Sequence, residues 1–260
     1  MLDSLSPIMA GALGSLAAGL MTALGALPML FFRRPSVQVQ SVLLGFAAGV
    51  MLAASFFSLI IPGVASLEEN GTARAMAAGI MCAAVLIGAT VIGLMNRFAP
   101  VDMLAIGPAG SSDLSRRIWL FIIAITLHNF PEGAAVGVSF GGGDMSQGLS
   151  TALGIGIQNM PEGLAVFAAM ASLGYARGPA FLAALASGLV EPVGGLIGAG
   201  VVGFLPSALP WGLGLAAGAM IYVVAAEIIP ETRRQSHGDG SMIGLMIGLV
   251  GMMFLDIALG

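Results

Sequence analysis

"HNFPEG", residues 128–133, recurs thirty residues later as "QNMPEG", residues 158–163, and each copy lies within a long apolar run. Both copies place a polar pair, a proline and a glutamate in surroundings that are otherwise hydrophobic. A proline inside a helix removes a backbone hydrogen bond, and a carboxylate in hydrocarbon is costly. Two copies of so unfavourable a pattern, in the same register, indicate that both segments serve one purpose.

The composition around these motifs is that of a membrane protein. Of 260 residues, 58% are hydrophobic and 8% are charged, and the mean hydropathy is +1.01. A soluble domain carries about 25% charged residues. We therefore expect the lipid bilayer, and no nucleic acid, as a partner. The single cysteine, Cys82, excludes a disulfide framework and a cysteine-based zinc site.

Long apolar segments divide the whole chain. A membrane-spanning helix needs about 20 mostly apolar residues. Eight such segments are present, at approximately 8–32, 38–61, 73–96, 118–139, 147–173, 179–203, 211–231 and 241–259. Frequent glycine and the lack of an alternating pattern favour helices over a barrel. We predict an all-α membrane protein with eight transmembrane helices, forming a single transmembrane domain over residues 1–260.

The arginines predict the orientation of these spans. Lysine is absent, and eight of the nine arginines fall in the loops after spans 1, 3, 5 and 7. Only Arg74 falls on the other side. Because cytoplasmic loops carry an excess of basic residues, those four loops are cytoplasmic. We therefore expect a multi-pass protein of the cell (inner) membrane, with N- and C-termini that are both extracytoplasmic.

Four acids, Glu132, Glu162, Glu191 and Glu227, fall within spans 4 to 7. An acid at the middle of a bilayer costs at least about 2.5–3.5 kcal/mol. Every arginine lies at a span end or in a loop, so no basic side chain is available inside the membrane. The acids are therefore protonated, line a wet cavity, or hold a cation. A neutral glutamate joining two helices is the ordinary explanation for one such residue, but several without a basic partner favour the cation.

Helical spacing gathers the polar residues of the two motifs. On span 4, His128, Asn129 and Glu132 project from one face. Span 5 repeats this face with Gln158, Asn159 and Glu162. A proline near each interior acid also frees one backbone carbonyl in spans 4 to 7. Carboxylates, an imidazole, amide oxygens and carbonyls form a mixed nitrogen and oxygen ligand set, which suits zinc and similar divalent metals better than Na⁺ or K⁺.

At these residues the chain resembles the ZIP family (Zrt-, Irt-like proteins) of divalent-metal transporters, and in particular its bacterial GufA-like branch. The resemblance extends to "GLVEPVGG" (188–195) and "AAEIIPETRR" (225–234) on spans 6 and 7. It implies a homodimeric importer with a 3+2+3 arrangement, in which spans 1–3 and 6–8 are inverted repeats around helices 4 and 5.

The resemblance also implies a binuclear metal site at the membrane midplane, on helices 2, 4, 5 and 6. The first position would use His128, Glu132, Gln158, Glu162 and Met51. The second position would use Asn129, Glu132, Asn159, Glu162 and Glu191. By its sequence context alone Met51 is one of 17 methionines, and such a residue is more often apolar filler.

Three further residues resemble positions on the metal pathway. Ser58 and Asp256 would lie on the outer side, although Asp256 could equally be an ordinary interfacial residue. Glu227 would lie on the exit side, but many relatives have a histidine where this chain has Ala226, which weakens an exit-side metal position. Many relatives also have histidine where this chain has Gln158, so ligand strength is expected to differ.

The expected function is transport of divalent metal into the cytoplasm, with Zn²⁺ first and Cd²⁺, Fe²⁺ and Mn²⁺ as alternatives. The metal would be the substrate, no organic cofactor is expected, and the chain would not be an enzyme. Two alternatives stay open: an intramembrane metalloenzyme and a proton-coupled carrier of an organic cation. The single membrane-embedded histidine and the lack of an HExxH pair disfavour catalytic zinc.

Overall fold

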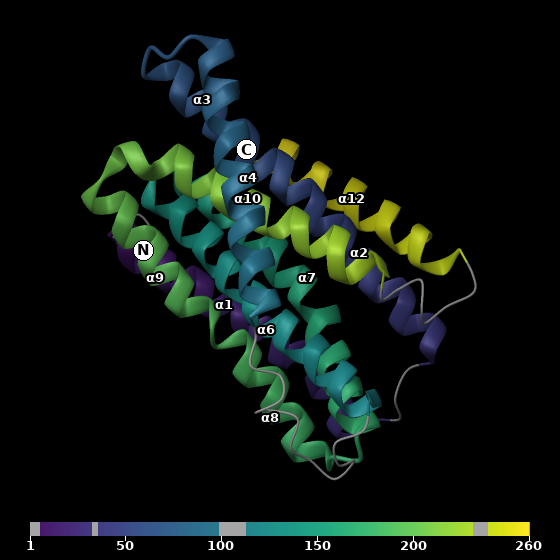
Figure 1. Ribbon diagram of the computed structural model, residues 1–260. Helices are drawn as coiled ribbons and strands as arrows, with labels where there is room; N and C mark the ends of the chain where they lie inside the picture. Colours follow the sequence, from purple (N-terminus) through teal and green to yellow (C-terminus); the bar gives the residue numbers. More distant parts are fainter. Residues whose placement is uncertain (1–5, 33–35, 99–112, 231–238, 260) are drawn as a thin grey trace.

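The computed structural model describes residues 6–32, 36–98, 113–230 and 239–259, and these residues form helices and short connections without a strand (Figure 1). The first half contains α1 (Pro7–Ala26), η2 (Leu27–Leu30), α2 (Val37–Ala54), η3 (Ser55–Ile60), α3 (Ile61–Glu69) and α4 (Arg74–Arg97). The second half contains α6 (Asp113–Gly141), α7 (Met145–Ser172), α8 (Arg177–Gly188), α9 (Glu191–Phe204), η4 (Pro206–Ala208), α10 (Leu209–Val223), η5 (Val224–Ile228) and α12 (Gly240–Leu259).

Six stretches of the described chain are long and apolar enough to cross a membrane. These stretches are Pro7–Leu30, Val37–Glu69, Arg74–Met95, Arg177–Phe204, Pro206–Ala226 and Gly240–Ala258. The two remaining long helices, α6 and α7, carry the paired motifs, whose polar residues lower their hydropathy. The described residues are thus those of an all-α membrane protein.

Three prolines lie inside spans that continue past them. Both α6 and α7 continue through Pro131 and Pro161 without a break. The second span, predicted to end at 61, instead continues past Pro62 to Glu69. A π-helical segment, η3, precedes this proline, so Pro62 stands in the first turn of α3, where its missing N–H is tolerated.

The sixth predicted span is interrupted. Its first half, α8, ends at Gly188, and α9 begins at Glu191 after a two-residue turn. The interruption places Glu191, an acid at the predicted midplane, in the first turn of a helix. The N-terminal turn of a helix has free N–H groups and favours a negative charge.

The α6 and α7 helices form an antiparallel hairpin near the middle of the bundle, with α8 and α9 along one side and α2 and α12 along the other (Figure 1). The connection is tight because Gly143 has a positive φ of 87°. Asp144 then caps α7, since its carboxylate accepts hydrogen bonds from the backbone N–H groups of Ser146 (2.9 Å) and Gln147 (3.0 Å). The hairpin fixes the register in which the two motifs meet.

Glycines on α2 and α12 let these helices approach closely. Gly49 of α2 lies against the carbonyl oxygen of Leu245, and Gly248 of α12 lies against the carbonyl oxygen of Phe46. A Cβ atom at either glycine would overlap with backbone. Small residues at the contact are typical of helix pairs in membranes.

The α10 and α4 pair repeats this contact. Gly218 of α10 lies against the carbonyl oxygen of Val85, and Gly88 of α4 lies against the carbonyl oxygen of Leu215. The sequences around the two contacts also match, with "AAGVM" at 47–51 of α2 and "AAGAM" at 216–220 of α10. Positions 49 and 218 therefore correspond, as do 248 and 88.

The glycines of the paired motifs make a second pair of equivalent contacts. Gly133 lies against the carbonyl oxygen of Glu191 on α9, and Gly163 lies against the carbonyl oxygen of Thr22 on α1. Each motif helix is thereby packed on a different outer helix, α6 on α9 and α7 on α1. These contacts set the depth at which the polar side chains of α6 and α7 meet.

Candidate metal centre

The hairpin brings the two motifs face to face. The Nε2 atom of His128 lies 3.2 Å from Oε2 of Glu162. The side-chain amide nitrogen of Gln158 donates a hydrogen bond to Oε1 of Glu132. Each contact joins one residue of HNFPEG to one residue of QNMPEG, so the structure brings together the four residues that helical spacing had placed on facing sides.

Three of these residues are close enough to share one cation. His128, Glu132 and Glu162 each offer one ligand atom, and these atoms lie within 4.8 Å of one another. Each of the three side chains is at most 1% exposed. Two carboxylates and an imidazole at this separation form a compact mixed-ligand site for a divalent metal.

A neighbouring layer contains Glu191 and Asn159. The amide nitrogen of Asn159 donates to Oε1 of Glu191 (2.7 Å) and to the backbone carbonyl oxygen of Ala18 (2.9 Å). Because Asn159 directly follows Gln158 in the sequence, the two layers are adjacent along α7. The α1, α7 and α9 helices thus meet at this layer.

Several buried oxygen atoms in the two layers have no hydrogen-bond partner among the described residues. They are Oε2 of Glu132, Oε1 of Glu162, Oε2 of Glu191, Oε1 of Gln158 and Oδ1 of Asn159. A buried acceptor without a partner costs about 1–3 kcal/mol, and more when it is charged. A bound cation would satisfy such acceptors, so the donor set fits a metal.

The described arginines do not supply that cation. Arg74 lies 3.8 Å from Glu68 on the bundle's edge, and Arg177 donates to the backbone carbonyl oxygen of Leu30 (2.8 Å). Lysine is absent from the chain. Within the described part of the chain, no arginine balances these carboxylates, which leaves protons or a metal ion to do so.

Two other predicted ligands are buried nearby without a described contact to the cluster. Asn129 is fully buried on α6, and both atoms of its amide lack a hydrogen-bond partner among the described residues. Met51 is fully buried on α2, which packs against α7. Their roles as metal ligands stay predictions.

A second polar cluster, the outer cluster, is formed by Asp256, Ser58, Ser150 and Gln147. Oδ1 of Asp256 accepts hydrogen bonds from the hydroxyls of Ser58 (2.6 Å) and Ser150 (3.0 Å). Gln147 donates to the backbone carbonyl oxygen of Ser58 (3.2 Å). The Asp256 carboxylate thus joins three segments of the bundle, and its role on the metal pathway stays a prediction.

Sequence reasoning predicted Ser58 and Asp256 but missed Ser150 and Gln147. A single serine or glutamine in a helix has many ordinary explanations, so its type alone is a weak signal. The sequence signal that could have found Ser150 is its spacing. It precedes Gln158 by eight residues, which is two steps of four, and therefore lies on a similar face of α7. The prediction for Glu227 cannot be compared in this way, because its side chain lies outside the described residues, although its backbone belongs to η5.

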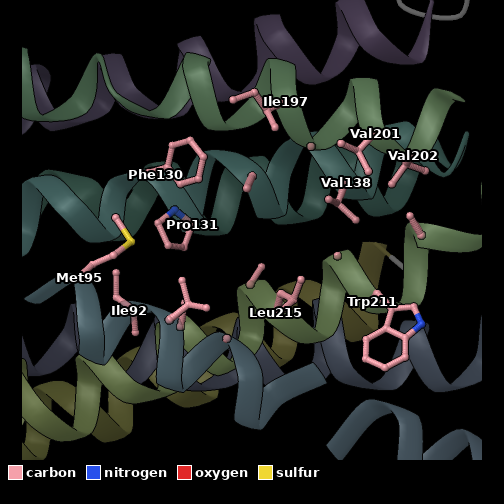
Figure 2. Close-up of a pocket in the computed structure, with 18 residues that line it drawn as sticks. Ile92, Met95, Phe130, Pro131, Val138, Ile197, Val201, Val202, Trp211 and Leu215 are labelled. Atoms are coloured by element: carbon pink, nitrogen blue, oxygen red, sulfur yellow. The ribbon is translucent and has the colours of Figure 1, made fainter. Parts of the chain in front are cut away.

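The opposite face of α6 is apolar. Phe130 and Pro131, which separate the polar residues of the first motif, line a cavity of about 350 Å³ between α4, α6, α9 and α10 (Figure 2). The other labelled residues around it are also hydrophobic, Trp211 among them. The motif therefore divides α6 into a polar face toward α7 and an apolar face toward α4 and α10.

The chain is similar to known proteins over almost its whole length. Residues 108–256 match the family model described as ZIP Zinc transporter. The chain is 47% identical to zinc transporter ZIPB of Bordetella bronchiseptica, over 95% of this chain and 81% of that protein. It is 40% identical to zinc transporter GufA of Myxococcus xanthus, over 96% of this chain and 99% of that protein. It is also 32% identical to zinc transporter ZIP11 of Xenopus tropicalis over the full length of both. The predicted resemblance is confirmed: this chain belongs to the ZIP family of zinc transporters.

Proposed function

We propose that this protein carries divalent metal, Zn²⁺ first, across the cell (inner) membrane into the cytoplasm. The observation that carries the proposal is the buried cluster in which His128, Glu132 and Glu162 present ligand atoms within 4.8 Å of one another. Relatives that match almost the whole chain are named as zinc transporters. The metal is the substrate of this site, and no organic cofactor takes part.

Two metal positions would share the carboxylates of the motif hairpin. The first uses His128, Glu132, Gln158, Glu162 and Met51. The second uses Asn129, Glu132, Asn159, Glu162 and Glu191. The contact between Asn159 and Glu191, one layer from the His128 cluster, supports a second position. Imidazole and carboxylate ligands suit Zn²⁺ and Cd²⁺, while Fe²⁺ and Mn²⁺ remain candidate substrates.

The proposed architecture is eight transmembrane helices in one transport domain of residues 1–260, arranged 3+2+3 with inverted repeats around α6 and α7. The repeated glycine contacts support it. The α2–α12 contact corresponds to the α10–α4 contact, and the α9–α6 contact corresponds to the α1–α7 contact. Each correspondence exchanges an element that precedes the hairpin with one that follows it.

Orientation and assembly complete the proposal. The arginine-rich loops are on the cytoplasmic side, which leaves both termini extracytoplasmic. The family resemblance supports a homodimer. The chain would act as a transporter rather than an enzyme, because a carboxylate-rich site with one imidazole favours metal release over retention.

Metal uptake into proteoliposomes tests the proposal. We expect Zn²⁺ to accumulate with the wild-type protein and with Glu69→Gln, since Glu69 is exposed at the end of α3. Glu162→Gln keeps the size of the side chain but removes a ligand charge, so uptake should fall to the background of empty vesicles. A protein that binds zinc but never moves it would support the metalloenzyme, and uptake of an organic cation without metal would support the carrier.

A further inference from the structure

On α7, Gly154 lies between the residue that contacts the outer cluster and the residue that contacts the metal centre. Ser150, Gly154 and Gln158 follow one another at intervals of four residues. Residues at this spacing lie on one face of a helix, about 6 Å apart along its axis. Ser150 contacts Asp256, and Gln158 contacts Glu132. Gly154 therefore marks the level halfway between the two carboxylates.

At this middle level the partner of α7 is the thioether of Met252. The Sδ and Cε atoms of Met252 occupy the space that a Cβ atom at Gly154 would take. Met252 is 1% exposed and stands one helical turn before Asp256 on α12. A cation that travels from Asp256 to Glu132 along this face of α7 passes the sulfur of Met252.

The equivalent position in the other half of the molecule does not carry a sulfur atom. The glycine contacts relate position 88 of α4 to position 248 of α12. Four residues further along each helix, Met252 corresponds to Ile92, which is also 1% exposed. A branched aliphatic side chain thus fills this position where packing alone is needed, although a buried methionine is more often simple filler.

We propose that Met252 is a transient thioether ligand for the permeating metal ion, placed between the outer carboxylate of Asp256 and the metal centre. Methionine has three rotatable bonds and a polarisable sulfur, so its end can leave Gly154 and meet a cation without backbone movement. Soft ligands favour soft metals, so the step selects Cd²⁺ over Zn²⁺ and disfavours Mn²⁺. The inference rests on the proposed function, because it assigns one step of the same transport path.

Thiol labelling tests whether position 252 meets the metal path. In a Cys82→Ser background, which removes the exposed native thiol, Met252→Cys should react with a charged methanethiosulfonate reagent. Cd²⁺ should slow that reaction severalfold. The matched control is Met246→Cys, at a position of the same helix that is 50% exposed on the outside of the bundle, where Cd²⁺ should have no effect. An unreactive Met252→Cys, or a reaction that Cd²⁺ does not slow, would overturn the inference.

Transport selectivity gives a second measurement, which stands if the cysteine variant does not fold. Met252→Leu keeps the volume and removes the sulfur, so the ratio of Cd²⁺ to Zn²⁺ uptake should fall severalfold. Met246→Leu should leave the ratio unchanged. An unchanged ratio in Met252→Leu would show that Met252 is packing alone. Wild-type protein that moves neither metal would instead contradict the proposed function, so the two failures are distinguishable.

Discussion

At the scale of single residues, the site depends on side chains that are costly in a membrane unless a cation is present. The sequence predicted that His128, Glu132, Gln158 and Glu162 would face one another, because they repeat at helical spacing in two motifs. The structure brings them together. The hydrogen bond between Asp256 and Ser150 could not be predicted in this way, because neither residue belongs to a repeated motif.

Gln158 sets the strength of the first metal position. A neutral amide oxygen is a weaker ligand for zinc than imidazole. Gln158→His should therefore tighten equilibrium Zn²⁺ binding and slow uptake, because transport needs a site that also releases its ion. Both quantities can be measured on one preparation by zinc titration and by vesicle uptake. If neither changes, Gln158 is not a ligand.

Glu191 tests the second metal position. Glu191→Gln removes a charge from the layer that contains Asn159 but leaves His128 in place. Affinity for the second Zn²⁺ should fall at least roughly 10-fold, because the loss of even an outer-shell partner of a metal ligand costs about 10–100-fold, while the first affinity changes less. Calorimetric titration of the wild type and the variant measures both. Unchanged stoichiometry and affinities would remove Glu191 from the site.

At the scale of helices, the apolar runs predicted where most spans lie but not how they are interrupted. The third span, predicted at 73–96, is α4 (Arg74–Arg97), and the eighth, predicted at 241–259, is α12 (Gly240–Leu259). The second span was predicted to end at 61, so its continuation to Glu69 was missed. An interior proline need not end a helix: η3 precedes Pro62, and α6 and α7 continue through Pro131 and Pro161.

Close helix contacts predict a sharp difference between two glycines. Gly163→Ala would place a methyl group against the Thr22 backbone, so we expect a loss of about 1–3 kcal/mol in the free energy of unfolding, as for other overpacked sites. Gly200→Ala is the control, because a Cβ atom there meets nothing within 4 Å. Thermal unfolding in detergent compares the two. Equal midpoints would mean that α1 and α7 do not pack as described.

At the scale of the whole molecule, the acids that matter most lie in the hairpin of α6 and α7, and the net charge of −4 comes from few charged residues. The hairpin holds carboxylates and an imidazole that must be free of protons to bind metal. Zn²⁺ and protons therefore compete, and affinity should fall as pH decreases from about 7.5 to 5.5, across the range in which an ordinary histidine gains its proton. Zinc titrations at several pH values measure this. Affinity that is constant over this range would contradict the competition.

The inverted repeat around α6 and α7 was expected only from the family resemblance, and it stays a proposal. Gly49 and Gly218 make similar contacts on different helices, which supports the proposed repeat. The matching sequences are too short, at five residues each, to have identified the repeat by themselves. Burial of both glycines against backbone is what gives the match a physical meaning.

The coordination shell of bound zinc tests the central claim most directly. The chain has two histidines, His128 in the metal centre and His237 outside the described residues. X-ray absorption at one Zn²⁺ per chain should show nitrogen and oxygen ligands at about 2.0–2.2 Å. The imidazole signal should persist in His237→Ala and disappear in His128→Ala. A wild-type shell without imidazole, or one that depends on His237, would contradict a zinc site shared by the two motifs.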